Sequence, residues 1–310
     1  MRVIFLAILV LSLIIPVGMF DASAVTNDGS VDSTVEINDS NTSGLNLQNE
    51  DKFGVSVANI GDLDGDGVND LLVGENGNDN SGANRGAVHI LFMNTDGTVK
   101  SALKIKDATT NGPNLANNDW FGTSVESISD LNGDGVDDFI IGAWKDDGGT
   151  PSANDSGNVA ILYPDTDGSL VREKREIKNT TANGPELSAN DYFGISVANM
   201  GDLNGDGWDD LAIGAIGDDA GGTDRGAVHI IYMAENGFVS SSEEINSNTA
   251  NGPELTNGDN FGRSVENIGD LDGDGVNDLA VGADHDDVGE NSKIVFDFDD
   301  PMGEIGRAHV

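Results

Sequence analysis

Four Asp-rich segments carry oxygen-bearing side chains at alternating positions, a pattern typical of cation-binding loops. In the first, Asp62-Leu-Asp64-Gly-Asp66-Gly-Val68-Asn-Asp70, carboxylates stand at loop positions 1, 3, 5 and 9, and the backbone carbonyl of Val68 is the expected ligand at position 7. Hard cations such as calcium take six to eight oxygens at about 2.3–2.6 Å, and this alternation points successive carboxylates inward. Glycines at positions 4 and 6 permit the tight curl. The segment is therefore predicted to bind calcium.

The same loop recurs three more times, with Asn instead of Asp at position 3 of the second and third copies. The corresponding predicted ligand sets are Asp130, Asn132, Asp134, the Val136 carbonyl and Asp138; Asp202, Asn204, Asp206, the Trp208 carbonyl and Asp210; and Asp270, Asp272, Asp274, the Val276 carbonyl and Asp278. Several carboxylates within one short loop repel one another without a cation. We therefore expect up to four Ca²⁺ ions, one per loop, rather than magnesium, which prefers to retain several waters.

Two other interpretations of these loops fit less well. An EF-hand needs a bidentate Glu at position 12 and flanking helices, whereas position 12 is occupied by Val73, Ile141, Ile213 and Val281. Those residues are expected to face the core from a strand. A solvated acidic turn would leave the repulsion between the carboxylates uncompensated.

A repeated unit positions the loops. The sequence Phe-Gly-x-Ser-Val recurs at Phe53, Phe121, Phe193 and Phe261, at intervals of 68, 72 and 68 residues, and each copy leads into an Asp-rich loop. A short apolar segment ending in Gly follows each loop, and a Leu lies six residues before each Phe. Self-similarity at a fixed period is the signature of a repeat architecture.

Each unit is predicted to form four short strands. In the third unit these cover residues 193–198, which alternate in polarity, then 210–214, 226–232 and 239–245, with a hairpin turn at 235–237. The apolar segments are too short for helices and are bounded by Gly, Asn and Asp. Because a small four-stranded sheet cannot bury its faces alone, such sheets stack radially as the blades of a propeller. The expected fold is all-β.

The combined motif resembles the FG-GAP repeat of integrin α-subunit propellers, over about residues 49–300. Gly-Ala closes the motif at Gly142, Gly214 and Gly282, whereas the first copy has Gly74-Glu75. The resemblance implies a seven-bladed ring, of which this chain would be a truncated part, with calcium in loops on one face. It also implies ligand recognition, often in adhesion, on the opposite face.

The predicted organisation follows the repeats. The segments are a signal peptide at 1–24; a fourth strand of a closing blade plus a connection at 25–48; blades at 49–118, 119–190 and 191–258; an incomplete fourth blade at 259–303; and a suspected sequencing artefact at 304–310. The signal peptide combines Arg2, an apolar run shorter than a membrane span and Ala22-Ser23-Ala24. A ring closed by four blades is the alternative to one with further blades.

The composition of the chain excludes several classes of partner and of chemistry. The chain has 55 acidic against 15 basic residues, a net charge of −40, and no cysteine. Nucleic acid and anionic membranes need basic patches and are poor partners, and thiolate chemistry is excluded. Outside residues 1–24, no segment is apolar enough to span a membrane. The mature chain is therefore expected to be secreted or at the cell surface.

Catalysis within this fragment is not expected. His89 and His229 occupy the same place in two repeats and are interpreted as repeat structure, and Ser56 lacks the last glycine of a nucleophile elbow. A second set of paired acids, including Asp146-Asp147 and Asp218-Asp219, is interpreted as solvated loop, with an auxiliary cation site as the alternative.

We therefore expect an exported calcium-binding module that binds a protein or glycan ligand, with a role in cell adhesion. The alternative is a non-catalytic FG-GAP module of a larger secreted hydrolase. Asn-x-Ser/Thr sequons, the acceptors for N-glycosylation, begin at Asn38, Asn41, Asn154 and Asn179.

Overall fold

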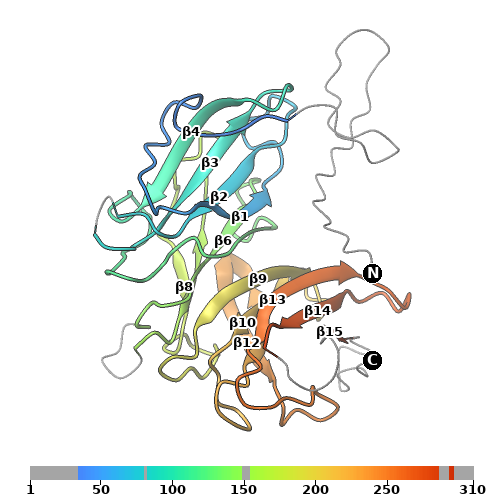
Figure 1. Cartoon of the computed structure of the whole chain (residues 1–310). Coiled ribbons are helices and arrows are strands. Elements are labelled where there is room, and N and C mark those ends of the chain that lie inside the picture. The colour runs from blue at the N-terminus through green and yellow to red at the C-terminus, as the bar shows by residue number, and fades with distance from the viewer. Residues whose placement is uncertain (1–33, 80–81, 149–153, 286–292, 297–310) are drawn as a thin grey trace.

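The computed structural model describes residues 34–79, 82–148, 154–285 and 293–296. The described chain is built from antiparallel sheets joined in sequence (Figure 1). The first contains β1 (Phe53–Asn59), β2 (Leu71–Glu75), β3 (Ala87–Met93) and β4 (Val99–Lys106). The second contains β5 (Val125–Ile128), β6 (Asp138–Ala143), β7 (Asn158–Leu162) and β8 (Arg175–Ile177).

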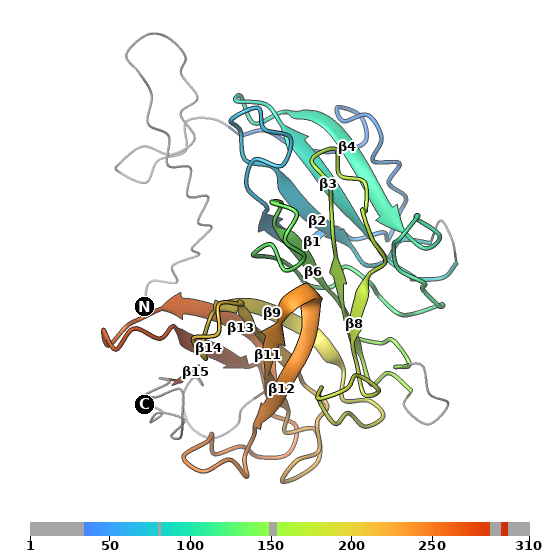
Figure 2. The ribbon, with the colours of Figure 1, turned by 180° about the vertical axis from the view of Figure 1, so that it is seen from behind.

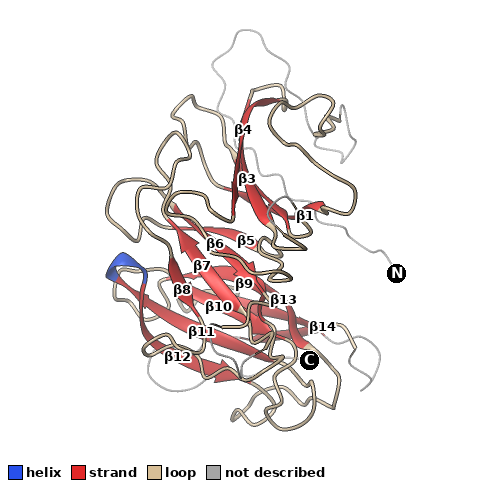
Figure 3. Cartoon of the chain, turned by 90° about the vertical axis from the view of Figure 1, so that its left-hand side faces the viewer, coloured by secondary structure: helices blue, strands red, loops and turns tan. Residues whose placement is uncertain are grey.

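The remaining two sheets repeat this order. The third contains β9 (Phe193–Gly201), β10 (Asp210–Ala215), β11 (Ala227–Ala234) and β12 (Phe238–Ile245). The fourth contains β13 (Phe261–Gly269), β14 (Asp278–Ala283) and β15 (Lys293–Phe296). One 3₁₀ turn, η1 (Glu235–Gly237), connects β11 to β12 and is the blue segment in Figure 3. The chain is thus an all-β, partial β-propeller, and we call its sheets blades 1 to 4.

The strands predicted for the third unit are confirmed, with one difference. Residues 193–198 were expected to alternate between buried and exposed, but they are buried on both sides in β9. The reason is their place in the fold. Each first strand contacts the first strand of the next blade, as β5 does β9 and β9 does β13. These strands therefore lie between neighbouring sheets, whereas the outer strand β12 is largely exposed.

The hydrophobic core lies between the blades. One buried cluster joins blades 1 and 2 through residues such as Phe92 and Phe139, and similar clusters join blades 2 and 3 and blades 3 and 4. Figure 2 shows the resulting succession from behind, with blade 1 at one end, blades 3 and 4 at the other and blade 2 between them. On the outer face of blade 1, the fully buried Leu45 packs with Val73 and Leu91.

The Phe-Gly pair of each repeat forms the joint to the preceding blade. The N–H groups of Phe121, Phe193 and Phe261 donate to the carbonyls of Arg85, Ser156 and Arg225, respectively, at 3.1, 3.0 and 2.9 Å. These carbonyls lie just before the third strand of the preceding blade. The three Phe side chains are almost completely buried. One short motif therefore supplies both a backbone hydrogen bond and an apolar contact to each joint.

The Ser and Gly of the motif complete this joint. Ser196 Oγ in blade 3 donates to the carbonyl of Gly262 in blade 4 at 2.8 Å, and Ser56 and Ser124 make the equivalent bonds to the following blades. Gly262 has φ of +90°, a region that disfavours side chains. The same Gly262 carbonyl lies 1.9 Å from the position a Cβ of Gly214 would take. Glycine at position 214 is thus required for the approach of the next blade.

This joint makes a stability prediction. Gly214→Ala should lower the free energy of unfolding by about 1–3 kcal/mol, because the added methyl meets a backbone carbonyl that cannot rotate away. Ser196→Ala should cost about 1 kcal/mol through the lost hydrogen bond. Urea denaturation at fixed calcium measures both, with the exposed Ser241→Ala as the control. Equal midpoints for Gly214→Ala and the control would contradict this role of the joint.

A buried Asp lies two residues before the Phe of each of the four Phe-Gly motifs. Asp51, Asp119, Asp191 and Asp259 are at most 3% exposed, and each accepts a hydrogen bond from the N–H three residues earlier, at 2.7, 2.6, 2.5 and 2.6 Å, respectively. Burial raises the pKa of Asp119 and of Asp191 to about 7, with neighbouring carboxylates adding to the effect. This carboxylate closes the turn that leads into each blade.

Several expectations fall wholly or mainly outside the described residues. These are the signal peptide at 1–24, the tail at 304–310 and most of the closing strand predicted before residue 48; its residues 34–37 have no strand assignment. No helix in the described parts of the chain has the length and apolar character needed to cross a membrane.

Candidate metal centres

Each Asp-rich loop connects the first and second strands of its blade. The first lies between β1 and β2, and the others take the equivalent places before β6, β10 and β14. Since the strand order is the same in every blade, the loops lie at the same end of each sheet. The loop ends where the buried second strand begins, so its position is set by the core.

The position-1 carboxylate organises the curl of each loop. Asp202 accepts hydrogen bonds from the N–H groups of Gly205, Asp206 and Gly207 at 2.7, 3.0 and 2.8 Å. Asp130 and Asp270 make the same three bonds within their loops, and Asp62 makes two of them. The backbone thus wraps around one carboxylate, which leaves the side chains at positions 3 and 5 on the exposed or half-exposed part of the loop.

Positions 5 and 7 are linked by a further hydrogen bond. In the third loop the Trp208 N–H donates to Asp206 Oδ1 at 3.0 Å, and Val68, Val136 and Val276 do the same in their own loops. The side chains at position 7 are partly buried and pack against the hydrophobic clusters. An apolar residue at this position therefore anchors the loop to the core.

The position-9 carboxylate is buried and ties the loop to the sheet. Asp210 accepts hydrogen bonds from the N–H groups of Leu203 at 3.0 Å and of Met233, at the end of β11, at 2.8 Å. Asp70 accepts the equivalent pair of hydrogen bonds. Asp138 and Asp278 accept the equivalent of the bond from within the loop, which comes from the backbone N–H at position 2. Burial raises the pKa of Asp138 to about 8 and that of Asp210 to about 7. These are buried carboxylates whose ionised form a bound cation would favour.

Three of the predicted carboxylate ligands come together in the first loop and three in the fourth. Carboxylate oxygens of Asp62, Asp64 and Asp70 lie within 4.8 Å of one another, and so do those of Asp270, Asp272 and Asp274. In the second and third loops position 3 is Asn132 or Asn204, whose amide oxygen is also a calcium ligand. The donor set is thus entirely oxygen and fits a hard cation. At position 12, Val73, Ile141, Ile213 and Val281 are buried strand residues, which agrees with the exclusion of an EF-hand.

The first loop already holds a cation from the chain itself. Lys100 Nζ, on β4, lies 2.6 Å from Asp64 Oδ2 and 2.7 Å from Asp66 Oδ2. The hydrogen bond from Lys100 lowers the pKa of Asp66, and the two carboxylates raise the pKa of Lys100. Strand register and turn sequence place Val171 and Ser240 at the equivalent positions of blades 2 and 3. The ammonium shows where a cation sits against these oxygens, and sequence reasoning missed it because 34 residues separate Lys100 from Asp66.

The second acidic set agrees with its prediction in part: Asp147 and Asp219 are exposed and Asp146 is half-buried, while the third pair, Asp286-Asp287, lies outside the described residues. Asp218 was expected in a solvated loop but is only 7% exposed, because its turn folds back against the end of β10. His229 lies beside it, buried at the same strand position as His89, so the expectation of repeated placement for the two histidines is confirmed.

The model of the FG-GAP repeat matches residues 53–91, 193–231 and 261–295. The chain carries FG-GAP repeats. It is 30% identical over 246 residues to integrin alpha pat-2 of Caenorhabditis elegans, a match that covers 75% of this chain and 18% of the relative. It is 32% identical over 235 residues to integrin alpha-V of Gallus gallus, a match that covers 74% of this chain and 20% of the relative. It is 35% identical over 167 residues to integrin alpha-11 of Homo sapiens, a match that covers 53% of this chain and 12% of the relative.

These matches support the resemblance to integrin α-subunit propellers. They also set its extent, because the matched part spans a fifth or less of each of these relatives.

Proposed function

We propose that this chain is an exported calcium-binding β-propeller that acts as an extracellular or surface binding module in cell adhesion. The observation that carries the proposal is the recurrence of one oxygen-lined loop at the same end of all four blades. Packing accounts for the buried residues at positions 7 and 9 of each loop, but it does not account for the exposed or half-exposed oxygen-bearing side chains at positions 3 and 5. Similarity to integrin α subunits favours the adhesion role over that of a hydrolase module.

Calcium is the cation that suits the loops best. Carboxylate and amide oxygens at positions 1, 3, 5 and 9, with the position-7 carbonyl, supply the number and hardness of ligands that calcium takes. Up to four ions would bind, one in each loop, to the residues given under "Sequence analysis". When bound, calcium neutralises the carboxylates and fixes the curl that the position-1 Asp begins. We assign no catalytic role to any residue of this chain.

Further blades would complete the ring. In β1, Val55 and Val57 are 45% and 57% exposed, whereas the equivalent Ile195 and Val197 of β9 are 7% and 8% exposed. The β9 residues are covered because β9 packs against strands of blade 2, including β5 and β6. We infer that another blade of the same kind covers β1, which is consistent with the seven-bladed ring implied by the family.

Calcium should raise the melting temperature, because a ligand bound only by the native state stabilises it. Differential scanning calorimetry with calcium and with chelator measures the shift, and calcium titration gives the stoichiometry. Asp206→Ala should remove one equivalent and leave the other loops intact. Ser241→Ala is the matched control in the same blade. Identical melting curves with and without chelator would contradict the metal assignment.

Lys100 should weaken calcium binding in the first loop, since an entering ion must displace its ammonium. Lys100→Ser, which reproduces the residue of blade 3, is expected to tighten that site about three- to tenfold, as judged from the strength of exposed ion pairs. The reciprocal change Ser240→Lys should weaken the third loop. Isothermal titration calorimetry resolves both effects. Unchanged affinities in both variants would show that the lysine does not compete.

The binding role has its own test. An array of glycans and a panel of immobilised extracellular-matrix proteins are probed with the full chain, in calcium and in chelator. Retention that depends on calcium is the expected result. Failure to retain the chain on any probe in calcium, despite a confirmed calcium stoichiometry, would count against the adhesion role while leaving the metal sites in place.

A further inference from the structure

A second group of chemically active side chains lies beyond the end of the second strand in each of blades 1 to 3. In blade 3 it consists of Asp218, His229 and Glu244, which we call the strand-end cluster. His229 on β11 is opposite Ile213 of β10 and Glu244 of β12. Asp218 follows β10, and its N–H donates to the carbonyl of Ala215. The Asp-rich loop of the blade lies at the other end of β10, where it ends at Asp210, about 10 Å from the level of Ile213 and His229 at the rise of a strand.

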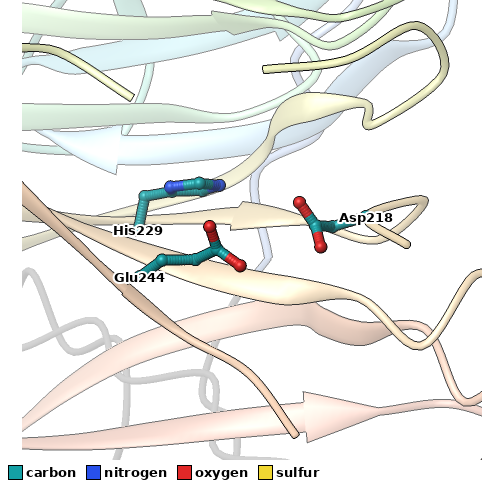
Figure 4. A group of neighbouring side chains, drawn as sticks. All are labelled: Asp218, His229 and Glu244. Carbon is teal, nitrogen blue, oxygen red and sulfur yellow. The ribbon is translucent and has the colours of Figure 1, made fainter. Parts of the chain in front are cut away.

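The three side chains of the strand-end cluster converge on one space. Their ligand atoms lie within 4.8 Å of one another, and Figure 4 shows the imidazole and both carboxylates turned toward each other. His229 is 2% exposed, and its Nε2 is buried without a hydrogen-bond partner. Buried polar groups are rarely left unpaired, since each one costs free energy comparable to a lost hydrogen bond. The unpaired nitrogen therefore indicates a missing partner.

Neighbouring groups hold these side chains without filling the space. Asp218 Oδ1 accepts the Ala220 N–H at 2.7 Å, and the Asn246 amide donates to Glu244. The ring of His229 packs edge-on against Phe193, with 5.4 Å between the centroids. Burial lowers the pKa of His229 to about 4, so the imidazole is neutral at pH 7 and has a lone pair to offer.

In blade 1 the Nε2 atom of the equivalent His89 has a carboxylate partner, whereas its Nδ1 is buried without a hydrogen-bond partner. His89 Nε2 is 2.7 Å from Glu75 Oε2, and Lys104 Nζ is 2.9 Å from the same oxygen. Asn78, at the position of Asp218, donates to Glu75 Oε1 at 3.0 Å. Blade 1 therefore pairs Glu75, which also shares a side-chain hydrogen bond with the buried Asp51, with one ammonium group, and it occupies Nε2 of the histidine.

Blade 2 places its lysines differently. Ala160 replaces the histidine, and Glu176 is paired with Lys174 at 3.2 Å and with Lys178 at 2.5 Å. Asp146, at the position of Asp218, accepts a hydrogen bond from Asn158 at 3.4 Å. Both ammonium groups thus pair with Glu176, and the nearby carboxylates of Asp146 and Asp119 accept hydrogen bonds from neutral donors.

Blade 3 has neither of these lysine arrangements. Its residues at the lysine positions of blade 2 are Ser242 and Asn246, and the lysine of blade 1 is replaced by Glu244. Glu75 of blade 1 corresponds to Ala215, so the histidine has lost its carboxylate partner in the strand. Asp218, Glu244 and a neutral imidazole remain, with the buried carboxylate of Asp191 nearby, and no ammonium group pairs with Asp218 or Glu244 in the described residues.

We propose that the strand-end cluster of blade 3 binds a divalent transition-metal ion of the zinc class through Asp218, His229 and Glu244. An imidazole nitrogen with carboxylate oxygens is a donor set that zinc accepts, whereas calcium takes oxygen ligands. The ion takes the part that lysines play in blades 1 and 2. It compensates both carboxylates and gives His229 a partner. Three protein ligands leave a fourth position for water.

The test uses the full chain with its loops saturated by excess calcium, so that exposed carboxylates do not compete. Co²⁺ serves as a spectroscopic probe, and Zn²⁺ is then added to displace it. One equivalent of Co²⁺ with the intense visible bands of a low-coordinate nitrogen-containing site is expected, displaced by Zn²⁺ but not by calcium. His229→Gln should abolish it, as should Glu244→Lys, which introduces the lysine of blade 1.

Two further variants keep the test decisive. His89→Gln changes the equivalent histidine of blade 1 and should leave the Co²⁺ stoichiometry unchanged. If His229→Gln does not fold, as judged by circular dichroism, the smaller change Asp218→Asn decides, and unchanged Co²⁺ affinity would overturn the proposal. It would equally be overturned if Co²⁺ were displaced by calcium or kept its spectrum in folded His229→Gln. Because calcium binding is measured separately, failure of the calcium proposal does not mimic failure of this one.

Discussion

Repulsion between carboxylates is the constraint that every blade has to meet. The chain has 55 acidic against 15 basic residues, and many of the acids occupy fixed and buried positions in the repeat. Backbone N–H groups satisfy part of this demand at positions 1 and 9 of the loops and at the buried Asp before each Phe. Lysines meet another part where a blade has them. In our proposals, bound cations compensate what remains.

The joint between blades allows this variation. Its repeated part is made from Phe, Gly and Ser of one motif, with hydrogen bonds to backbone carbonyls, and these motif residues are uncharged. These repeated contacts therefore do not depend on how each blade balances its acids, and charged contacts such as that of Arg175 with blade 3 add to them at single joints. Blade 1 can use Lys100 and Lys104, blade 2 can use Lys174 and Lys178, and blade 3 has none of these, without any change in the sheet order.

Short-range patterns were readable from the sequence. The repeat, the strands of the third unit and the burial of position 12 follow from periodicity and spacing, because they depend on neighbours along the chain. Contacts between distant residues were not. The bond from Ser196 to Gly262 spans 66 residues, and Lys100 reaches Asp64 from 36 residues away. Asp218 appeared to be solvated because its sequence is that of an acidic loop, and only the fold shows it buried against His229.

A crystal of the full chain grown in calcium and measured for anomalous scattering tests the central claim most directly. The account predicts a calcium peak inside each Asp-rich loop of the described blades, with oxygen ligands at about 2.3–2.6 Å from positions 1, 3, 5, 7 and 9. Loops without anomalous density, with the carboxylates of positions 3 and 5 turned toward solvent, would contradict it.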